Sequence, residues 1–407
     1  MSLKQISRRL FFVLVACSLV AAMLLPGNVW ATSRRKGPYL IMTGEPTSMT
    51  VLWQLDGTAA CTLEWGKDAG YGMGRVQTTE HGDDHQHAHR IGGLEPGTLY
   101  RYRVWMGDHA YPGTFRTSPA AGADHLKFMA YGDTRSYPLV HDHVAEAMLE
   151  QMRRDPGYRT FLVVVGDLVH RGRQEADWDQ QFFDPAYTHI QELLASLPYQ
   201  SCIGNHDLKG SGPDLFSKYF PYRWTASHYG SFDYGPAHFT YVDQYADYSP
   251  GSSQYRWIVS DLAATRKPWR FVVLHEPGWS AGGGHSDNTA VQRYLQPLFE
   301  RYHVAVVFAG HNHYYARAVV NGVQHVTTGG GGAPLYNPDA GAPHVVTIAK
   351  SYHFCRIEID GGRLSFEAVQ PNGTVIDSFR LVRELTHRRE RMQQPHPAPL
   401  PTRPNRR

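Results

Sequence analysis

The chain has 407 residues, of which 42% are apolar and 19% charged; this is a globular composition for two or three domains, and it excludes a disordered or collagen-like chain. The formal net charge of +3 is unevenly placed, because residues 1–31 carry +3 and residues 387–407 carry +5, which leaves −5 on the body between them. This mildly acidic body argues against a nucleic-acid surface spread over the fold, whereas the 23 histidines favour metal chemistry.

Residues 1–31 have the pattern of an export signal. Arg8 and Arg9 precede an apolar run at 10–25, and residues 29–31 form an acceptable small-residue cleavage site. The run is short for a membrane span, so we expect no transmembrane segment after signal removal. Residues 7–12 resemble the twin-arginine signal of bacteria, which predicts an exported bacterial protein in the periplasm or medium. An ordinary secretory signal, or a lipoprotein signal ending at Cys17, is the alternative.

Residues 37–118 are predicted to form short β-strands separated by turns. Over residues 99–104 apolar and polar side chains alternate, which places Tyr100, Tyr102 and Val104 on one face. Four histidines gather in this part of the chain: His81, His85, His87 and His89. They could bind a metal, but no ordered ligand set is visible, so we expect an exposed strand and loop. Residues 119–124 then form a linker.

From residue 125 the pattern changes to alternating strands and helices. Apolar runs occur at 126–131, 161–165, 201–203, 271–274 and 304–308, and helical spacing occurs at 140–152 and 290–302. We expect an α/β domain over residues 125–384 with a largely central sheet. After residue 314 hairpins return, with a strong turn signal at Asn321-Gly322, and predict a second, more antiparallel sheet.

The C-terminal residues 387–407 are rich in Arg and Pro, and we predict a disordered basic tail. Once the signal is removed, the remaining cysteines are Cys61, Cys202 and Cys355. They lack metal-type spacing, and their odd number defines no framework, so no disulfide is predicted.

Five apolar runs each end in a residue that can bind a metal. In α/β sheets such side chains gather at the carboxyl ends of the strands. One such residue alone would more often be a hydrogen-bonded polar group of the core, but five in this order predict a dinuclear metal centre. The residues predicted to converge are Asp133, Asp167, Asn205, His275, His311 and His313.

The motifs resemble those of a known family: Gly132-Asp133, Gly166-Asp167, Gly204-Asn205-His206-Asp207, Val272-x-x-His275 and Gly310-His311-x-His313. This series is similar to that of the calcineurin-like metallophosphoesterases. The front segment resembles a fibronectin type III domain, and together with residues 310–317 it resembles the purple acid phosphatase branch. The resemblance implies an all-β sandwich followed by a four-layer α/β/β/α fold.

The resemblance also implies a ligand set for two metal ions, Fe, Mn or Zn. One ion would take Asp133, Asp167 and His313; the other would take Asp167, Asn205, His275 and His311, with Asp167 bridging. A hydroxide held between the ions would attack phosphorus.

Outside this ligand set, His206 would orient the phosphate and protonate the leaving oxygen. Arg135 and His285 are candidates for binding substrate, although His285 could equally be a surface residue of its Gly-rich loop.

One position departs from the purple acid phosphatases. They have a tyrosine three residues after the bridging aspartate, and here that residue is His170. His170 either replaces the tyrosine as a metal ligand or packs beside His206. Without tyrosinate, the purple charge-transfer band should be absent.

We therefore expect an exported metal-dependent hydrolase that acts on small phosphomonoesters, with no nucleic acid as a stable partner. A phosphodiesterase on the same centre, acting on cyclic nucleotides or lipid headgroups, is the first alternative. A catalytically dead fold that serves an adhesion module is the second.

Overall fold

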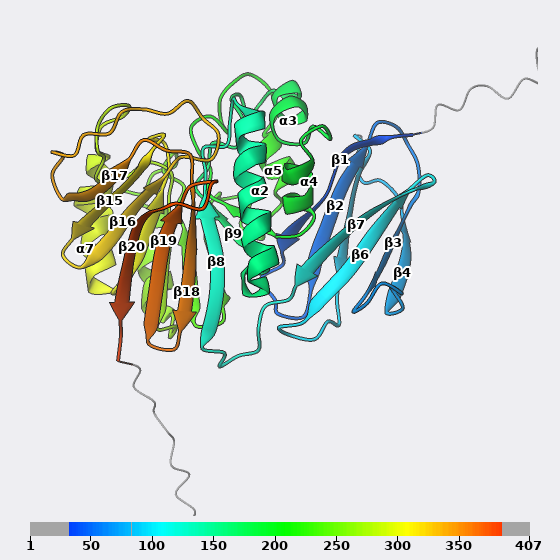
Figure 1. Ribbon diagram of the computed structural model, residues 1–407, viewed down its shortest axis with the longest axis horizontal. Helices are drawn as coiled ribbons and strands as arrows, with labels where there is room; N and C mark the ends of the chain where they lie inside the picture. Colours follow the sequence, from blue (N-terminus) through cyan, green and yellow to red (C-terminus); the bar gives the residue numbers. More distant parts are fainter. Residues whose placement is uncertain (1–31, 83, 385–407) are drawn as a thin grey trace, which may run out of the picture.

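The computed structural model describes residues 32–82 and 84–384 (Figure 1). The predicted signal peptide with Cys17 and the predicted tail at 387–407 lie outside the described residues. Among the helices that are described, none combines the length and apolar character needed to cross a membrane.

The first seven strands form two antiparallel sheets. The strands are β1 (Arg34–Met42), β2 (Met49–Leu55), β3 (Cys61–Gly66), β4 (Gly74–Thr78), β5 (Gln86–Ile91), β6 (Leu99–Met106) and β7 (His109–Arg116). A sheet in the order β1-β2-β5 shares one apolar core with a sheet in the order β4-β3-β6-β7. The predicted face of β6 is confirmed, because Tyr100, Tyr102 and Val104 are fully buried. This part of the chain is an all-β sandwich.

The histidine cluster of the sandwich is only partly at the surface. His87 is buried, stacks on Trp53 with ring centroids 5.2 Å apart, and lies 3.2 Å from the Thr78 hydroxyl through Nδ1. The expectation of an exposed histidine is therefore wrong at His87. The cause is strand alternation, since β5 turns His87 and Ile91 into the core while Ala88 and Arg90 point outward.

The remaining strands form two mixed sheets. They are β8 (His125–Tyr131), β9 (Leu162–Val164), β10 (Tyr199–Ser201), β11 (Gly230–Tyr234), β12 (Ala237–Tyr241), β13 (Trp269–Val273), β14 (Val306–Ala309), β15 (Tyr315–Val320), β16 (Val323–Thr328), β17 (Val345–Ala349), β18 (Phe354–Asp360), β19 (Arg363–Val369) and β20 (Val375–Val382). One sheet has the order β10-β9-β8-β18-β19-β20, and the other has the order β11-β12-β13-β14-β16-β15-β17.

The two sheets pack face to face, and helices cover their outer faces. The helical segments are α2 (Pro138–Arg154), η1 (Pro156–Tyr158), α3 (Glu175–Gln181), α4 (Thr188–Leu194), α5 (Leu215–Tyr219), α6 (Ser253–Ala264), η2 (Val291–Leu295) and α7 (Gln296–Arg301). Phe128 of β8 packs edge-on against Phe239 and Phe271 of the other sheet, 5.2 and 5.4 Å between centroids. Helices α2 and α4 share a core with β8 and β9, whereas α6 and α7 share one with β13 and β14. This is the expected four-layer α/β/β/α arrangement (Figure 1).

The parallel strands do not all lie in one sheet. Strands β8, β9 and β10 lie in the six-stranded sheet, while β13 and β14 lie in the seven-stranded one. Each sheet is completed by antiparallel strands from the end of the chain, as in the pairing of Phe128 in β8 with Ile357 in β18. The parallel strands thus divide between two layers, and their carboxyl ends remain at the same edge.

Two local predictions have different outcomes. The Asn321-Gly322 turn between β15 and β16 is confirmed, with φ of 48° and 85° as a tight hairpin of this kind requires. The single helix expected at 290–302 is instead a π-helical turn, η2, followed by α7. Pro297 stands at the start of α7, where a residue without an amide hydrogen is tolerated.

Ion pairs of a buried lysine join the sandwich to the α/β part of the chain. Lys36 of β1 has a fully buried side chain and contacts Glu175 at 2.7 Å and also Asp179, both on α3. The hydroxyl of Tyr39 donates to the Tyr219 carbonyl at 2.8 Å. Without these two carboxylates the buried ammonium group of Lys36 would be an uncompensated charge and would destabilise the fold. The ion pairs of Lys36 therefore fix β1 against α3.

A second buried histidine, His238 on β12, should make stability depend on pH. Its side chain lies between Asp233 at 2.7 Å and Asp261 at 2.9 Å, with Lys267 4.0 Å beyond Asp233. Burial lowers the pKa of His238, but the two carboxylates outweigh this and raise it to about 9. The raised pKa stabilises the fold below pH 6.5 by an amount on the order of 3 kcal/mol, and this is lost as the pH rises through 9. His238→Gln should therefore lower the free energy of unfolding at pH 6 and much less at pH 10.

Urea unfolding at several pH values measures this difference. His125, whose side chain is 70% exposed, supplies the matched control His125→Gln, for which we expect little change at any pH. An equal loss in His238→Gln at pH 6 and pH 10 would show that packing, rather than charge, is responsible.

Candidate metal centre

The strand ends carry an unusual backbone. Asp133, Asp167 and His311 have φ of 53°, 56° and 66°, a left-handed conformation that residues other than glycine seldom adopt. Gly166 also has positive φ, and a Cβ there would lie 2.8 Å from the amide nitrogen of Gly204. The turns after β8, β9 and β14 are thus tightly packed, and they direct the following side chains toward one point.

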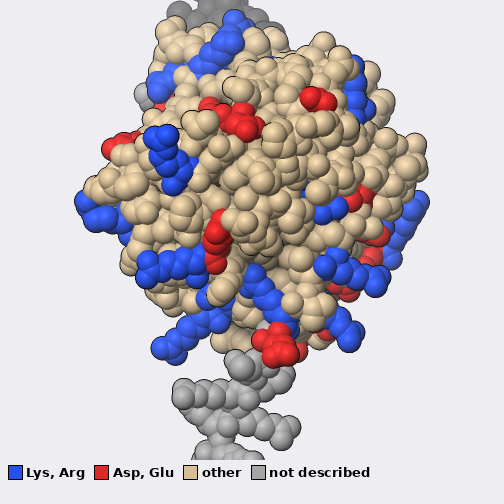
Figure 2. Space-filling view, turned by 90° about the vertical axis from the view of Figure 1, so that its left-hand side faces the viewer, with Lys and Arg blue, Asp and Glu red and all other residues tan. Residues whose placement is uncertain are grey.

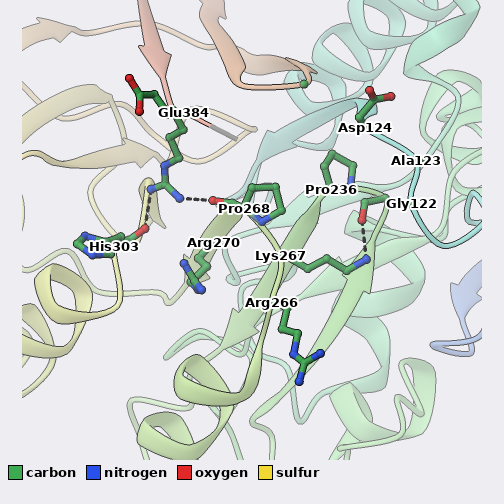
Figure 3. A pocket seen from close by; sticks show the side chains of 13 residues that line it. Gly122, Ala123, Asp124, Pro236, Arg266, Lys267, Pro268, Arg270, His303 and Glu384 are labelled. Carbon is green, nitrogen blue, oxygen red and sulfur yellow. Dashed lines mark hydrogen bonds between the residues drawn. The ribbon is translucent and has the colours of Figure 1, made fainter. Parts of the chain in front are cut away.

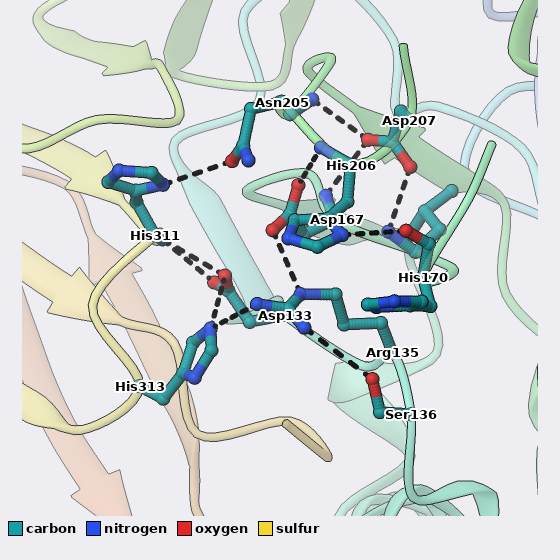
Figure 4. A network of polar contacts seen from close by, with 12 residues as sticks. Asp133, Arg135, Ser136, Asp167, His170, Asn205, His206, Asp207, His311 and His313 are labelled. Atoms are coloured by element: carbon teal, nitrogen blue, oxygen red, sulfur yellow. Dashed lines mark hydrogen bonds and ion pairs between the residues drawn. The ribbon is translucent and has the colours of Figure 1, made fainter. Parts of the chain in front are cut away.

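The six predicted residues come together at this edge of the two sheets. His275 Nε2 lies 3.1 Å from Asn205 Oδ1 and 3.4 Å from Asp167 Oδ1. His311 Nδ1 lies 3.1 Å from the same Asn205 oxygen. On the other side, His313 Nε2 lies 3.6 Å from Asp133 Oδ1 (Figure 4). Asp133, Asp167 and His313 also offer one ligand atom each within 4.8 Å of one another.

Backbone carbonyls determine which imidazole nitrogens face the centre. His275 Nδ1 donates to the Val165 carbonyl at 2.6 Å, and His313 Nδ1 donates to the Pro334 carbonyl at 2.8 Å. Each ring therefore directs Nε2 toward the neighbouring carboxylates. This arrangement is typical of histidines that bind metals.

Two carboxylates, Asp133 and Asp167, are buried here, and Arg135 contacts the second of them. Burial raises the pKa of Asp133 to about 7, and the nearby Asp167 adds to the effect. Burial alone would raise the pKa of Asp167 as well, but His275, His206 and Arg135 hold it below its usual range. The donor set of carboxylate, amide and imidazole suits borderline-hard metal ions, whose charge would compensate both carboxylates.

Arg135 lies among these side chains. Its Nε donates to Asp167 Oδ2 at 3.1 Å, and its Nη2 lies 3.1 Å from His313 Nε2 (Figure 4). The guanidinium thus contacts two of the expected metal ligands.

His206 and His170 form a pair beside the centre. The backbone amide of His206 donates to Asp167 Oδ1 at 2.8 Å, and its ring Nδ1 donates to the His170 carbonyl at 2.6 Å. Burial lowers the pKa of His206 to about 4. The His170 ring lies 5.0 Å from the His206 ring, and His170 is not one of the three clustered ligands. This position agrees better with packing beside His206 than with direct ligation.

His285 lies at the rim of the metal centre. Its ring stacks on His311 with centroids 3.7 Å apart, and its backbone amide donates to Asn312 Oδ1 at 2.7 Å. The residue is exposed, so it borders the centre on the solvent side, where a substrate would enter.

Sequence reasoning assigned no role to three residues that shape the site. Asp207 accepts hydrogen bonds from the amides of Asp167, Leu168 and Gly204 at 2.8–2.9 Å. Gln244 accepts from the His275 amide at 2.8 Å, and Tyr336 stacks on His313 with centroids 4.2 Å apart. Asp207 could have been suspected from its place in the Asn205-His206 motif, but no motif signals Gln244 or Tyr336.

Comparison with known proteins agrees with this geometry. Residues 126–315 match the family model of the calcineurin-like phosphoesterases, a range that contains all six converging residues. Residues 126–315 form a calcineurin-like metallophosphoesterase domain. Within the family the chain resembles the purple acid phosphatases, whose N-terminal sandwich its own first seven strands resemble.

Individual relatives support the same placement. The chain is 30% identical to purple acid phosphatase 21 of Arabidopsis thaliana over 270 residues, 60% of this chain and 58% of the relative. It superposes on a purple acid phosphatase from yellow lupin (Lupinus luteus) with a TM-score of 0.72 at 20% identity, covering 86% of this chain and 75% of that one. A structure named PhoD gives 0.64 at 15% identity, covering 88% and 91%. At these identities the two structures show the fold alone.

The chain spans about three fifths of the length of that curated relative. Purple acid phosphatases 21 and 23 and the probable purple acid phosphatase 20, all from Arabidopsis thaliana, are similar to this chain and lend no support to the bacterial origin that the twin-arginine resemblance implies.

Proposed function

We propose that the protein is a metal-dependent phosphatase that hydrolyses small phosphomonoesters. The observation that carries this proposal is the convergence of six metal-competent side chains, from two sheets, in a family of phosphoesterases. We also infer the division into a sandwich at 37–118 and a catalytic domain at 125–384, and export of the mature protein.

The donors fit two metal ions. One would be held by Asp133, Asp167 and His313; the other would share Asp167 and add Asn205, His275 and His311. Bound metal ions of the Fe, Mn or Zn type supply positive charge for the phosphate and lower the pKa of water.

The chain's own residues have separate tasks in this proposal. The carbonyl contact at Nδ1 fixes the His206 ring and leaves Nε2 to hold or transfer a proton at the leaving oxygen. His285 borders the phosphate from the rim, and Arg135 reaches it through its guanidinium. The fixed backbone turns and the hydrogen bonds of Asp207 keep these side chains in place.

Turnover of an aryl phosphate monoester and of its bis-aryl diester, with Fe, Mn and Zn in turn, tests the proposal. We expect the monoester to be preferred by at least about tenfold. A strong preference for the diester would instead identify a phosphodiesterase. No turnover of either ester by fully loaded protein would favour an inactive binding module.

Arg135 provides a further prediction. Its positive charge lies 3.1 Å from both Asp167 and His313, so it should weaken binding of the metal at that side by Coulomb repulsion. Arg135→Met should therefore retain this metal about tenfold more tightly against a chelator, as measured by elemental analysis after dialysis. Weaker retention would instead mean that Arg135 orders the ligands.

A further inference from the structure

A second charged cavity lies away from the metal centre. It has a volume of about 730 Å³, within the range of small-molecule sites. Four cationic side chains line it, namely Arg266, Lys267, Arg270 and Arg383, together with two acidic ones, Asp124 and Glu384 (Figure 3). Lys and Arg side chains also gather at the lower end of the face in Figure 2, beside the point where the described chain ends. We call this cavity the basic pocket.

The basic pocket lies at the opposite ends of the same strands. Strands β12, β13 and β14 run parallel, and the pocket residues Pro236, Arg270 and His303 precede or begin them. His275 and His311 follow β13 and β14 at the other end. Arg270 and His275 are five residues apart along the chain, which corresponds to roughly 16 Å of extended backbone. The pocket is therefore no extension of the metal centre.

The positive charges of the pocket have few acidic partners. Lys267 donates to the Gly235 carbonyl at 2.7 Å, Arg270 to the Thr265 carbonyl at 3.1 Å, and Arg383 to the carbonyls of Pro268 and His303. Within residues 32–82 and 84–384, the Arg266 side chain has no hydrogen bond or ion pair, and buried Nε of Arg270 has no partner. Lys267 approaches a single carboxylate, that of Asp233, at 4.0 Å.

Burial and the neighbouring cations destabilise the charged arginines of the basic pocket unless an anion compensates them. Burial lowers the pKa of Arg383 to about 10, and Arg270 lowers it further. Asp124 is 62% exposed and pairs with His125, and Figure 3 shows it and Glu384 on the other side of the pocket from Arg266 and Arg270. Arginine forks with free N–H groups match phosphate oxygens, and a concave pocket fits a small anion better than a flat surface.

We propose that the basic pocket binds a small, multiply charged phosphate anion, such as inorganic phosphate, diphosphate or a phosphorylated metabolite. This second site is separate from the metal centre and does not depend on the proposed reaction. The fork of Arg266 and the free N–H groups of Arg270 supply donors, and Arg383, held by two carbonyls, supplies fixed positive charge. Binding should weaken as salt is added, because three of the cations are partly exposed.

Equilibrium dialysis with labelled inorganic phosphate on the full, metal-loaded chain tests this. Asp167→Asn impairs the metal centre, so phosphate that it still binds reports the pocket. In that background, the double substitution Arg266→Gln and Arg270→Gln should weaken the remaining phosphate binding at least tenfold. If the double variant folds poorly, Arg266→Gln alone replaces it and should weaken the binding severalfold. The exposed Arg293, outside the pocket, supplies the control Arg293→Gln, which should bind normally.

Two outcomes would overturn the proposal. One is that Asp167→Asn binds no phosphate, or binds it equally with and without the pocket substitutions. The other is that the chain sediments with phosphatidylglycerol vesicles through Arg266 and Arg270 but binds no free phosphate or diphosphate, which would make the ligand a lipid headgroup. Arg266→Gln with Arg270→Gln, made in the chain that retains Asp167, keeps all the metal ligands, so its turnover of a monoester reports the proposed function independently.

Discussion

Asp167→Asn is expected to lower kcat for an aryl phosphate monoester about a thousandfold or more. Asp167 lies between the two halves of the ligand set, 3.4 Å from His275 Nε2 and within 4.8 Å of ligand atoms of Asp133 and His313. An amide has nearly the same shape but lacks the charge that would hold two cations. Turnover and metal content per chain, measured on the same sample, test the prediction.

The controls separate loss of chemistry from loss of fold. Asp108→Asn lies in the exposed turn between β6 and β7 and should keep full turnover and metal content. Thermal unfolding should show that Asp167→Asn remains folded, since the amide oxygen still accepts from the His206 amide. Turnover of Asp167→Asn close to the unsubstituted rate would refute the metal centre as the site of reaction.

His206→Ala is expected to lower kcat about a hundredfold with metal content unchanged. The His206 ring is oriented by its contact with the His170 carbonyl and lies beside Asp167 without being part of the ligand set. If it protonates the leaving oxygen, the loss should be large for an alkyl phosphate and much smaller for 4-nitrophenyl phosphate, whose leaving group needs no proton.

His170→Ala is the matched comparison for His206. It removes the neighbouring ring, 5.0 Å away, and leaves the carbonyl that orients His206. We expect a loss below about tenfold that is the same for both substrates. If His206→Ala lost equal activity on both substrates, its role would be to bind phosphate; if His170→Ala lost metal, His170 would be a ligand.

The strand ends show how far the sequence could be interpreted. A polar residue after an apolar run is a local signal, and the rule that such residues meet at the carboxyl edge placed Asp133, Asp167 and His275 together without a structure. The Asn321-Gly322 hairpin was predictable for the same reason, since its geometry depends on two residues.

Long-range pairings could not be predicted in this way. The pairing of Phe128 with Ile357 joins segments more than 200 residues apart, and it decides that the parallel strands divide between two sheets. The orientation of Arg135 toward His313, the stacking of Tyr336 and the basic pocket all depend on such tertiary contacts. His87 was misjudged because its burial depends on the register of β5 against β2.

The joint between β1 and α3 has a consequence for how the protein can be divided. Tyr39, Ile41 and Leu52 of the sandwich belong to the same apolar core as α2 and Trp178 of α3. Cutting the chain after the sandwich would expose this interior surface to water and leave Glu175 and Asp179 without Lys36. The sandwich is therefore packed against the α/β part of the chain and is not a detachable module. An isolated fragment of residues 125–384 would be prone to associate through the apolar surface that the sandwich normally covers.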